Sequence, residues 1–195
     1  SRGITNLQAI VQSVVAILKD AGAQPFLVPA MGSHGGAPPE GQAEVLAEYG
    51  ARVVMADIDA AKLGDAAAAI GKTGGRVEAV PLDVTDTSAL RAVIDGTAAR
   101  HGRLDIAFNN AGREVPYLRV AEIAESEFQS MLNLKLIGVW RCMKFELAQM
   151  VRQKHGVIVN MAGNWGLNGA PGFSSYCAAA HGIMGLTRTA AMEYG

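Results

Sequence analysis

Residues 104–112 read LDIAFNNAG and residues 50–59 read GARVVMADID, two short apolar runs that each end in polar side chains. Runs of about four to eight apolar residues, bounded by turn-forming residues, are typical of buried strands. The first run ends at Asn109 and the second at Asp57. Ligands of parallel sheets bind just beyond the carboxyl ends of the strands. The polar residues that follow each run are therefore the first candidates for function.

Similar runs recur along the chain and alternate with segments of helical periodicity. We expect further strands at 25–30, 77–83 and 156–161. Apolar residues spaced three and four apart predict helices at residues 7–19, 42–49, 60–70, 88–100, 125–154 and from 176 onward. Strands that alternate with helices predict an α/β fold with a parallel sheet. We expect one doubly wound, Rossmann-like domain over residues 1–195.

From its two ends, we expect this chain to be a fragment of a longer protein. The chain begins at Ser1 without a methionine and ends at Gly195 inside an apolar, helix-like segment. We therefore expect a doubly wound sheet that is truncated at its C-terminus, with the last strands missing.

Composition narrows the range of partners. The 17 basic and 18 acidic residues give a net charge of -1, which does not favour binding to nucleic acid or to an anionic membrane. No apolar run approaches the ~20 residues of a membrane helix. The two cysteines, Cys142 and Cys177, lack partners at metal-ligand spacing. We expect a cytoplasmic protein with reduced thiols, no bound metal and a small-molecule substrate.

Five motifs occur in an order that indicates a known family. They are GARVVMADID, PLDVTD at 81–86, LDIAFNNAG, GVIVNMAG at 156–163 and SSYCAAAHGIMGLTRTAAMEYG at 174–195. Through them, residues 50–195 resemble the short-chain dehydrogenase/reductase family. The resemblance implies an NAD(P)-dependent oxidoreductase that acts on an alcohol or a carbonyl compound.

The expected cofactor residues follow three strands. A carboxylate at Asp57 can accept both adenosine ribose hydroxyls and would repel a 2′-phosphate, which favours NAD over NADP. By resemblance, Asp83 meets the adenine with Val84 beside it, although Asp83 is equally suited to be the N-cap of the next helix. The resemblance also implies a loop along the cofactor, formed by Asn109, Asn110, Ala111 and Gly112.

The catalytic positions of the family are only partly kept. Tyr176 matches the general acid/base tyrosine, but Ala180 stands where the family lysine lowers the tyrosine pKa, and Gly163 where the substrate-binding serine belongs. An unperturbed tyrosine is ionised in only about one molecule in a thousand at pH 7. We therefore expect an impaired or inactive enzyme. The alternative is a catalytically silent nucleotide-binding or interaction module.

Lys135 occupies the position of the family asparagine, counted from Phe128. One interpretation is a lysine solvated on a helix face. The other is a rescue hypothesis, in which the ammonium of Lys135 takes the place left at Ala180 and polarises Tyr176. A different register would use Asn133 as the family asparagine.

The N-terminal quarter has a different character. Gly32 and Gly36 match the first glycine spacing of the family's phosphate loop, but Pro38 stands where a third glycine belongs. Residues 1–49, above all PAMGSHGGAPPEGQ, resemble the N-terminal domain of lactate racemase-like, nickel-pincer proteins. That resemblance makes His34 a candidate for proton transfer, against a plain loop histidine. We expect a chimeric join near residues 49–50.

The two long helical segments near the C-terminus bear on the oligomeric state. The segments at 125–154 and from 176 onward resemble the pair of helices through which family members dimerise. The resemblance therefore implies a homo-oligomer.

Overall fold

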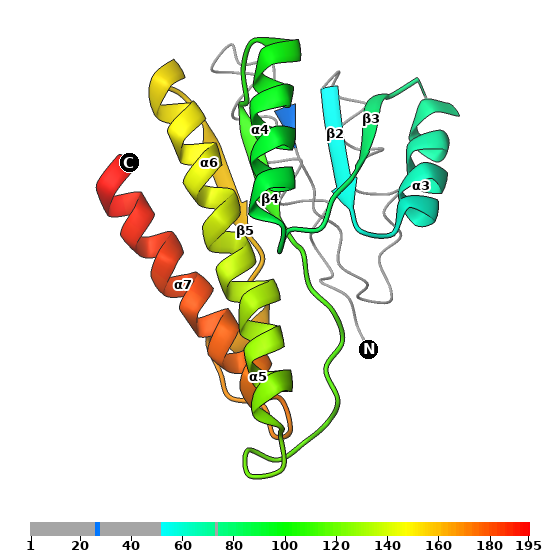
Figure 1. Ribbon diagram of the computed structural model, residues 1–195. Helices are drawn as coiled ribbons and strands as arrows, with labels where there is room; N and C mark the ends of the chain where they lie inside the picture. The colour runs from blue at the N-terminus through cyan, green and yellow to red at the C-terminus, as the bar shows by residue number, and fades with distance from the viewer. Residues whose placement is uncertain (1–25, 28–51, 73) are drawn as a thin grey trace.

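The computed structural model describes residues 26–27, 52–72 and 74–195 (Figure 1). Its strands are all parallel and are β1 (Phe26–Leu27), β2 (Arg52–Asp57), β3 (Arg76–Pro81), β4 (Ile106–Asn109) and β5 (Val157–Asn160). One sheet has the order β1-β2-β3, and β4 pairs with β5 in a second. Because β1 contacts β4, the combined order is β3-β2-β1-β4-β5. The predicted α/β fold with parallel strands is confirmed.

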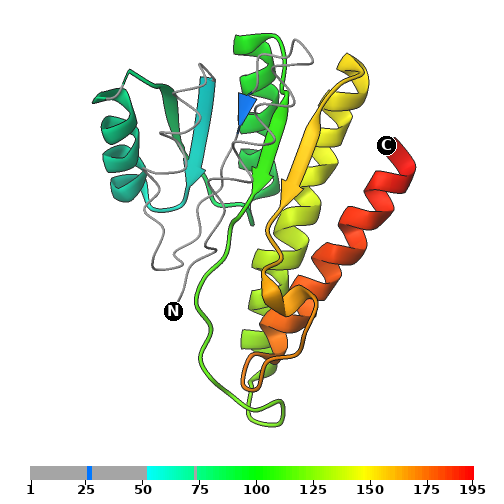
Figure 2. The same cartoon turned by 180° about the vertical axis from the view of Figure 1, so that it is seen from behind.

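Helices separate these strands along the chain. They are α3 (Ala60–Lys72), α4 (Thr87–His101), α5 (Glu125–Met131), the π-helix η1 (Leu132–Ile137), α6 (Gly138–Gln153), the short 3-10 helix η2 (Asn164–Gly166) and α7 (Ser174–Tyr194). Figure 2 shows β4 and β5 in front of α4 and α6, so these two helices cover one face of the strand pair. Helix α3 packs on β2 and β3, and α7 lies along α6.

Local chemistry explains where α4 begins and ends. Its N-cap is Asp86, whose carboxylate accepts hydrogen bonds from the amides of Ser88 and Ala89. The hydroxyl of Ser88 also donates to this carboxylate, and that bond, together with the two amide bonds, holds the pKa of Asp86 below its ordinary value. At the other end Gly102 adopts a left-handed conformation, with φ 80°. The alternative that made Asp83 the N-cap of this helix is therefore wrong.

The predicted helix over residues 125–154 is present but contains a wide turn. The N–H of Gly138 bonds the carbonyl of Asn133, five residues back, as in a π-helix. Such single-turn insertions are frequent at functional sites. An ideal Cβ on Gly138 would lie 3.2 Å from Cγ2 of Val84, so the helix passes very close to the segment after β3.

The apolar core divides into two clusters of side chains. One lies between β2, β4, α4 and α6 and includes Val54, Leu90 and Ala107. The other joins α5, α6 and α7 and includes Met131, Val139 and Ile183. Tyr176 belongs to the second cluster, so the tyrosine predicted to be catalytic is part of the packing between helices.

Candidate active site

Tyr176 lies in the first turn of α7 and is mostly buried, with 7% of its surface exposed. Trp165 meets the tyrosine ring edge-on, at 5.2 Å between ring centroids. Burial raises the pKa of Tyr176 above its ordinary value. The phenol is therefore held in its protonated form, which is the form that can donate a proton.

Lys135 lies over the face of this same ring. Its Nζ is 4.5 Å from the ring centroid of Tyr176 and donates a hydrogen bond of 3.2 Å to the carbonyl oxygen of Met161. Only 2% of the lysine is exposed, and burial lowers its pKa to about 8. The interpretation of Lys135 as a lysine solvated on a helix face is therefore wrong. The structure brings the two predicted catalytic residues together.

The π-helix decides which residue of this segment reaches the site. Oδ1 of Asn133 accepts a hydrogen bond of 3.1 Å from Arg141, on the same continuous helix. Lys135 instead reaches the end of β5 at Met161. The register that places Lys135, and not Asn133, at the family asparagine is the one with a side chain beside Tyr176.

Gly163 and Ala180 border the same tyrosine. Gly163 has a φ of 76°, and a Cβ built on it would lie 3.5 Å from the hydroxyl of Tyr176. The serine position thus faces the phenol but has a backbone that favours glycine. Ala180 is fully buried in the cluster that contains Tyr176. If these are the family's serine and lysine positions, as the motif spacing predicts, a hydrogen atom and a methyl group stand there in place of a hydroxyl and an ammonium group.

Asp57 closes β2 at the carboxyl edge of the sheet. Its Oδ1 accepts a hydrogen bond of 2.8 Å from the amide of Asp59, which fixes the turn into α3. Burial raises the pKa of Asp57, because the carboxylate is partly withdrawn from water. A carboxylate in this condition is suited to accept hydrogen bonds from neutral hydroxyl groups.

Asp83 and Val84 follow β3 at the same edge. Oδ1 of Asp83 accepts hydrogen bonds from the amide and the hydroxyl of Thr85, at 2.8 and 2.7 Å. Val84 is only 5% exposed and packs in the core cluster with Leu90 and Ala107. The carboxylate of Asp83 therefore stabilises the turn after β3. The side chain of Val84 anchors the same turn in the core.

The segment after β4 leads from the core to Lys135. Asn109 is buried at the strand end, whereas Asn110, Ala111 and Gly112 are half-buried. An ideal Cβ on Gly112 would lie 3.9 Å from Nζ of Lys135. The expected cofactor loop and the Lys135–Tyr176 pair are therefore neighbours, at the carboxyl edge of β4 and β5.

Comparison with known proteins gives this arrangement a family. The sequence profile of the short chain dehydrogenase family matches residues 40–195. The chain belongs to that family. The match begins ten residues before the join expected at 49–50, so residues 40–49 are family sequence too.

Individual family members agree in sequence and in fold. A short chain dehydrogenase/reductase of Aspergillus oryzae is 38% identical over 152 residues, or 77% of this chain and 58% of that protein. The crystal structure of levodione reductase has a TM-score of 0.81 at 32% identity, covering 89% of this chain and 67% of that one. NAD+-bound xylitol dehydrogenase has a TM-score of 0.78 at 29% identity, covering 88% and 65%.

The alignments also show how much of each relative this chain covers. It spans between 55% and 61% of the length of the curated family members it matches. Members of the family bind NAD or NADP, and solved neighbours include NAD-bound forms.

A buried polar network behind the site escaped the sequence analysis. Nδ2 of Asn109 donates to Oε2 of Glu146 at 2.9 Å and to Oδ1 of Asn160 at 3.0 Å. Asn160 in turn donates to Oγ1 of Thr187, on α7, at 3.0 Å. Glu146 is 3% exposed, and burial raises its pKa to about 7. The only signal in the sequence was one acidic residue at an inward position of an amphipathic helix.

Some expectations fall outside the described residues. Gly32, Gly36 and His34 all lie in the range 28–51. Within the described ranges, no group of three or more His, Cys, Asp or Glu side chains is arranged to hold a metal ion. Over the same ranges, no helix has both the length and the apolar character needed to cross a membrane.

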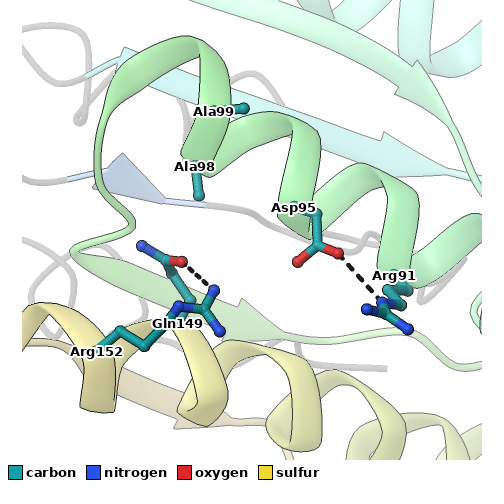
Figure 3. Close-up of a pocket in the computed structure, with 6 residues that line it drawn as sticks. All are labelled: Arg91, Asp95, Ala98, Ala99, Gln149 and Arg152. Atoms are coloured by element: carbon teal, nitrogen blue, oxygen red, sulfur yellow. Dashed lines mark hydrogen bonds and ion pairs between the residues drawn. The ribbon is translucent and has the colours of Figure 1, made fainter.

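A surface depression lies between α4 and α6, and Tyr176 is not among its lining residues. It is lined by Arg91, Asp95, Ala98, Ala99, Gln149 and Arg152 (Figure 3). Arg91 is ion-paired with Asp95 at 3.2 Å, and Arg152 is hydrogen-bonded to Gln149 at 2.5 Å. The polar side chains of the depression are therefore already paired with one another. They form no arrangement comparable to the Lys135–Tyr176 pair.

Proposed function

We propose that this chain is an NAD-dependent oxidoreductase of alcohols and carbonyl compounds, with Tyr176 as its acid/base group and with reduced activity. The observation that carries the proposal is the ammonium of Lys135, 4.5 Å from the ring centroid of Tyr176. It supplies, from a different helix, the positive charge that Ala180 lacks. The names of levodione reductase and xylitol dehydrogenase, which describe a reductase and a dehydrogenase, support the reaction class.

The proton chemistry follows from burial. Tyr176 is held protonated, so its hydroxyl is suited to protonate a carbonyl oxygen during reduction. In the direction of alcohol oxidation the phenolate must accept a proton. A cation over the ring stabilises that phenolate, and this is the role we assign to Lys135. When bound, NAD supplies the hydride acceptor or donor at the reacting carbon.

The loss of serine limits the rate. A hydroxyl at position 163 would donate to the oxygen on which negative charge develops, and one such donor is worth roughly 3 kcal/mol in comparable sites. Gly163 has no side chain to replace it. We therefore expect turnover well below that of a complete catalytic set, although Tyr176 and Lys135 remain.

Residues at the carboxyl ends of β2 and β4 fit the binding of NAD. The carboxylate of Asp57 is partly withdrawn from water, and two ribose hydroxyls would restore its hydrogen bonds. A 2′-phosphate would instead bring like charge to the same place. The half-buried loop of Asn110, Ala111 and Gly112 allows close approach of the rest of the cofactor. On this basis we assign NAD in preference to NADP.

A fluorescence titration with NADH tests the proposal. We expect Asp57→Ala to weaken binding at least tenfold, since hydrogen bonds to charged groups contribute about 1.5–3 kcal/mol. Asp65→Ala, on the exposed side of α3, is the matched control and leaves binding unchanged. NADPH is expected to bind at least tenfold more weakly than NADH. Equal affinity of wild type and Asp57→Ala contradicts the assignment of the cofactor site.

The second candidate is a catalytically silent nucleotide-binding or interaction module. Gly163 and Ala180 favour it, because both remove groups that the family uses in catalysis. NADH binding without any NADH oxidation in the presence of ketones would identify this alternative. Oxidation that disappears in Tyr176→Phe would eliminate it.

A homo-oligomer built through the long helices is part of the proposal. Ile137, Trp140, Lys144 and Val151 recur at helical spacing on η1 and α6, and the three apolar residues are 38%, 46% and 53% exposed. A second copy of the chain would cover this stripe. Sedimentation equilibrium tests it: Trp140→Glu should shift the protein toward the monomer, while Lys72→Glu on α3 should not.

Residues 1–49 add one weaker alternative. A racemase-type activity would use His34, which lies outside the described residues. The match to the short chain dehydrogenase family already includes residues 40–49. Nickel-pincer dependence of any activity would be required to keep it. We place the protein, as one domain, in the cytoplasm, where its free cysteines Cys142 and Cys177 stay reduced.

A further inference from the structure

We propose that the site takes a neutral alcohol or ketone whose reacting carbon belongs to a ring or is attached to one. This inference rests on the proposed function and names its substrate class. It is carried by a ladder of aromatic side chains that begins at an exposed loop and ends on Tyr176. The ladder consists of Tyr117, Phe173, Trp165 and Tyr176.

The rings contact one another in sequence. Tyr117 meets Phe173 edge-on at 5.7 Å between centroids, and Phe173 stacks on Trp165 at 4.4 Å with an interplanar angle of 26°. Trp165 then meets Tyr176 edge-on at 5.2 Å. These are the favourable geometries for aromatic pairs. The ladder therefore has a defined arrangement before any ligand binds.

Backbone contacts hold the two loops of the ladder together. The amide of Leu118 donates to the carbonyl of Gly172 at 3.1 Å, and Leu118 forms a parallel bridge with Phe173. Gly172 has a φ of 77°, and any Cβ there would collide with the ring of Tyr117. In Figure 2 the green loop after β4 and the orange loop before α7 meet at the end of the molecule where α5 and α7 begin. The loop after β4 is thereby fixed beside the catalytic tyrosine.

The exposed part of this surface is apolar. Tyr117 is 66% exposed, and Leu167, just beyond Trp165, is 65% exposed. Arg113, in the loop that carries Tyr117, is already ion-paired with Glu127 at 2.6 Å. The ladder itself thus presents ring faces and a leucine, and the exposed charged residues of the same loop, Glu114 and Arg119, are not members of it. A ring can lie against such a surface without losing the rotational freedom that a flexible chain loses.

The two tryptophans of the chain make the idea measurable. Trp140 lies on α6, 46% exposed, and Trp165 lies in the ladder. In the Trp140→Phe variant of the full chain, Trp165 is the only tryptophan reporter. Cyclohexanol and 2-hexanol, both six-carbon secondary alcohols, are titrated into this variant with and without saturating NAD+. We expect cyclohexanol to change the Trp165 emission at roughly three- to tenfold lower concentration than 2-hexanol.

Two substitutions locate the preference in the ladder. Phe173→Leu removes the stacked ring and should bring the ratio of the two half-saturation concentrations close to one. Tyr117→Leu does the same at the exposed rim, where folding is not at risk. Phe145→Leu, on α6 in the other core cluster, is the matched control and keeps the ratio.

The outcomes separate this inference from the proposed function. Equal or tighter binding of 2-hexanol, or no change of Trp165 emission with either alcohol, overturns the ring preference even where NAD+ binds. A ring preference that persists without NAD+ binding supports the inference and contradicts the proposed cofactor function. Loss of the preference in Phe145→Leu as well as in Phe173→Leu also overturns it, because the ladder would then not be its source.

Discussion

The proposed cofactor edge and the proposed catalytic corner of this molecule match the family motifs to different degrees. The cofactor edge, formed by Asp57 and the loop 109–112, keeps the family residues at the ends of β2 and β4. The catalytic corner, formed by Lys135, Gly163, Tyr176 and Ala180, is proposed to keep only the tyrosine of the family's catalytic set. Yet the corner remains well packed, and a cation again lies beside the phenol. Well-packed surroundings and a complete set of catalytic groups are therefore separate properties of a site, which experiments can test one at a time.

The largest expected effect is at Tyr176. Tyr176→Phe should lower NADH-dependent ketone reduction by at least a hundredfold, since a positioned general acid contributes about 10²–10⁴ in rate. NADH affinity should not change, because the cofactor edge is intact. Steady-state rates and NADH titration measure both, with Tyr194→Phe at the exposed end of α7 as control. A parallel loss of NADH binding would mean that the two regions are not separable.

Glu146 supports the cofactor edge through Asn109 and should make stability depend on pH. Its pKa rises from 4.5 to about 7 on folding, so the folded state retains the proton more strongly than the unfolded chain. The free energy of unfolding therefore falls as pH rises from about 4.5 to above 7, by about 3 kcal/mol in total. Urea unfolding at pH 5, 6, 7 and 8 should show this slope in wild type and lose it in Glu146→Gln.

The control for that experiment is Glu125→Gln, an exposed substitution in the first turn of α5. It should leave the wild-type slope in place. Stability curves of wild type and Glu146→Gln that run parallel over the whole pH range would show that the buried carboxyl is not the source.

A substitution at Gly163 tests whether the backbone of the catalytic corner tolerates a side chain at this position. Gly163→Ala should lower the free energy of unfolding by about 2 kcal/mol, because a Cβ is disfavoured at a φ of 76°. Gly169→Ala, whose Cβ would meet nothing within 4 Å, is the matched control in the same loop. Thermal or urea unfolding measures both. If the two variants are equally stable, the backbone at 163 does not oppose a return to serine.

The smallest expected effect concerns the charge over the tyrosine ring. Lys135→Met should move the pH profile of alcohol oxidation upward by about one unit, because phenolate forms less easily without the cation. At a fixed pH near 7 this is about a tenfold loss. Lys135→Arg keeps the charge and should keep more of the rate, and Lys72→Met, at the exposed end of α3, should change nothing. An unchanged profile in Lys135→Met would remove Lys135 from the mechanism.

The sequence anticipated most of the described fold. The runs ending at Asp57 and Asn109 were strands, and the segments at 60–70 and 88–100 were helices, because their periodicities differ and are local properties of the chain. The alternative role given to Asp83, as the N-cap of α4, was wrong, because Asp86 is the cap. Asp83 and Asp86 both precede the helix, and only the path of the backbone determines which carboxylate reaches the free amides.

The site was harder to derive than the fold. Tyr176, Asp57 and Gly163 could be named from motif spacing, since each follows a strand or begins a helix. The burial of Lys135 could not, because it depends on a π-turn that rotates the helix and on β5 lying beside it. Glu146 was missed for a similar reason: its partner Asn109 lies on another element, and hydrogen bonding between them leaves no periodic signal.

The sequence by itself determined the α/β alternation, the family and the residues that line the carboxyl edge of the sheet. These follow from hydrophobic periodicity and from short motifs, which act over a few residues. Only the tertiary structure decided that Lys135 lies over Tyr176, that Glu146 is buried against Asn109, and that an aromatic ladder reaches the catalytic tyrosine. Those contacts join residues far apart in the chain, and the packing of helices on strands brings them together.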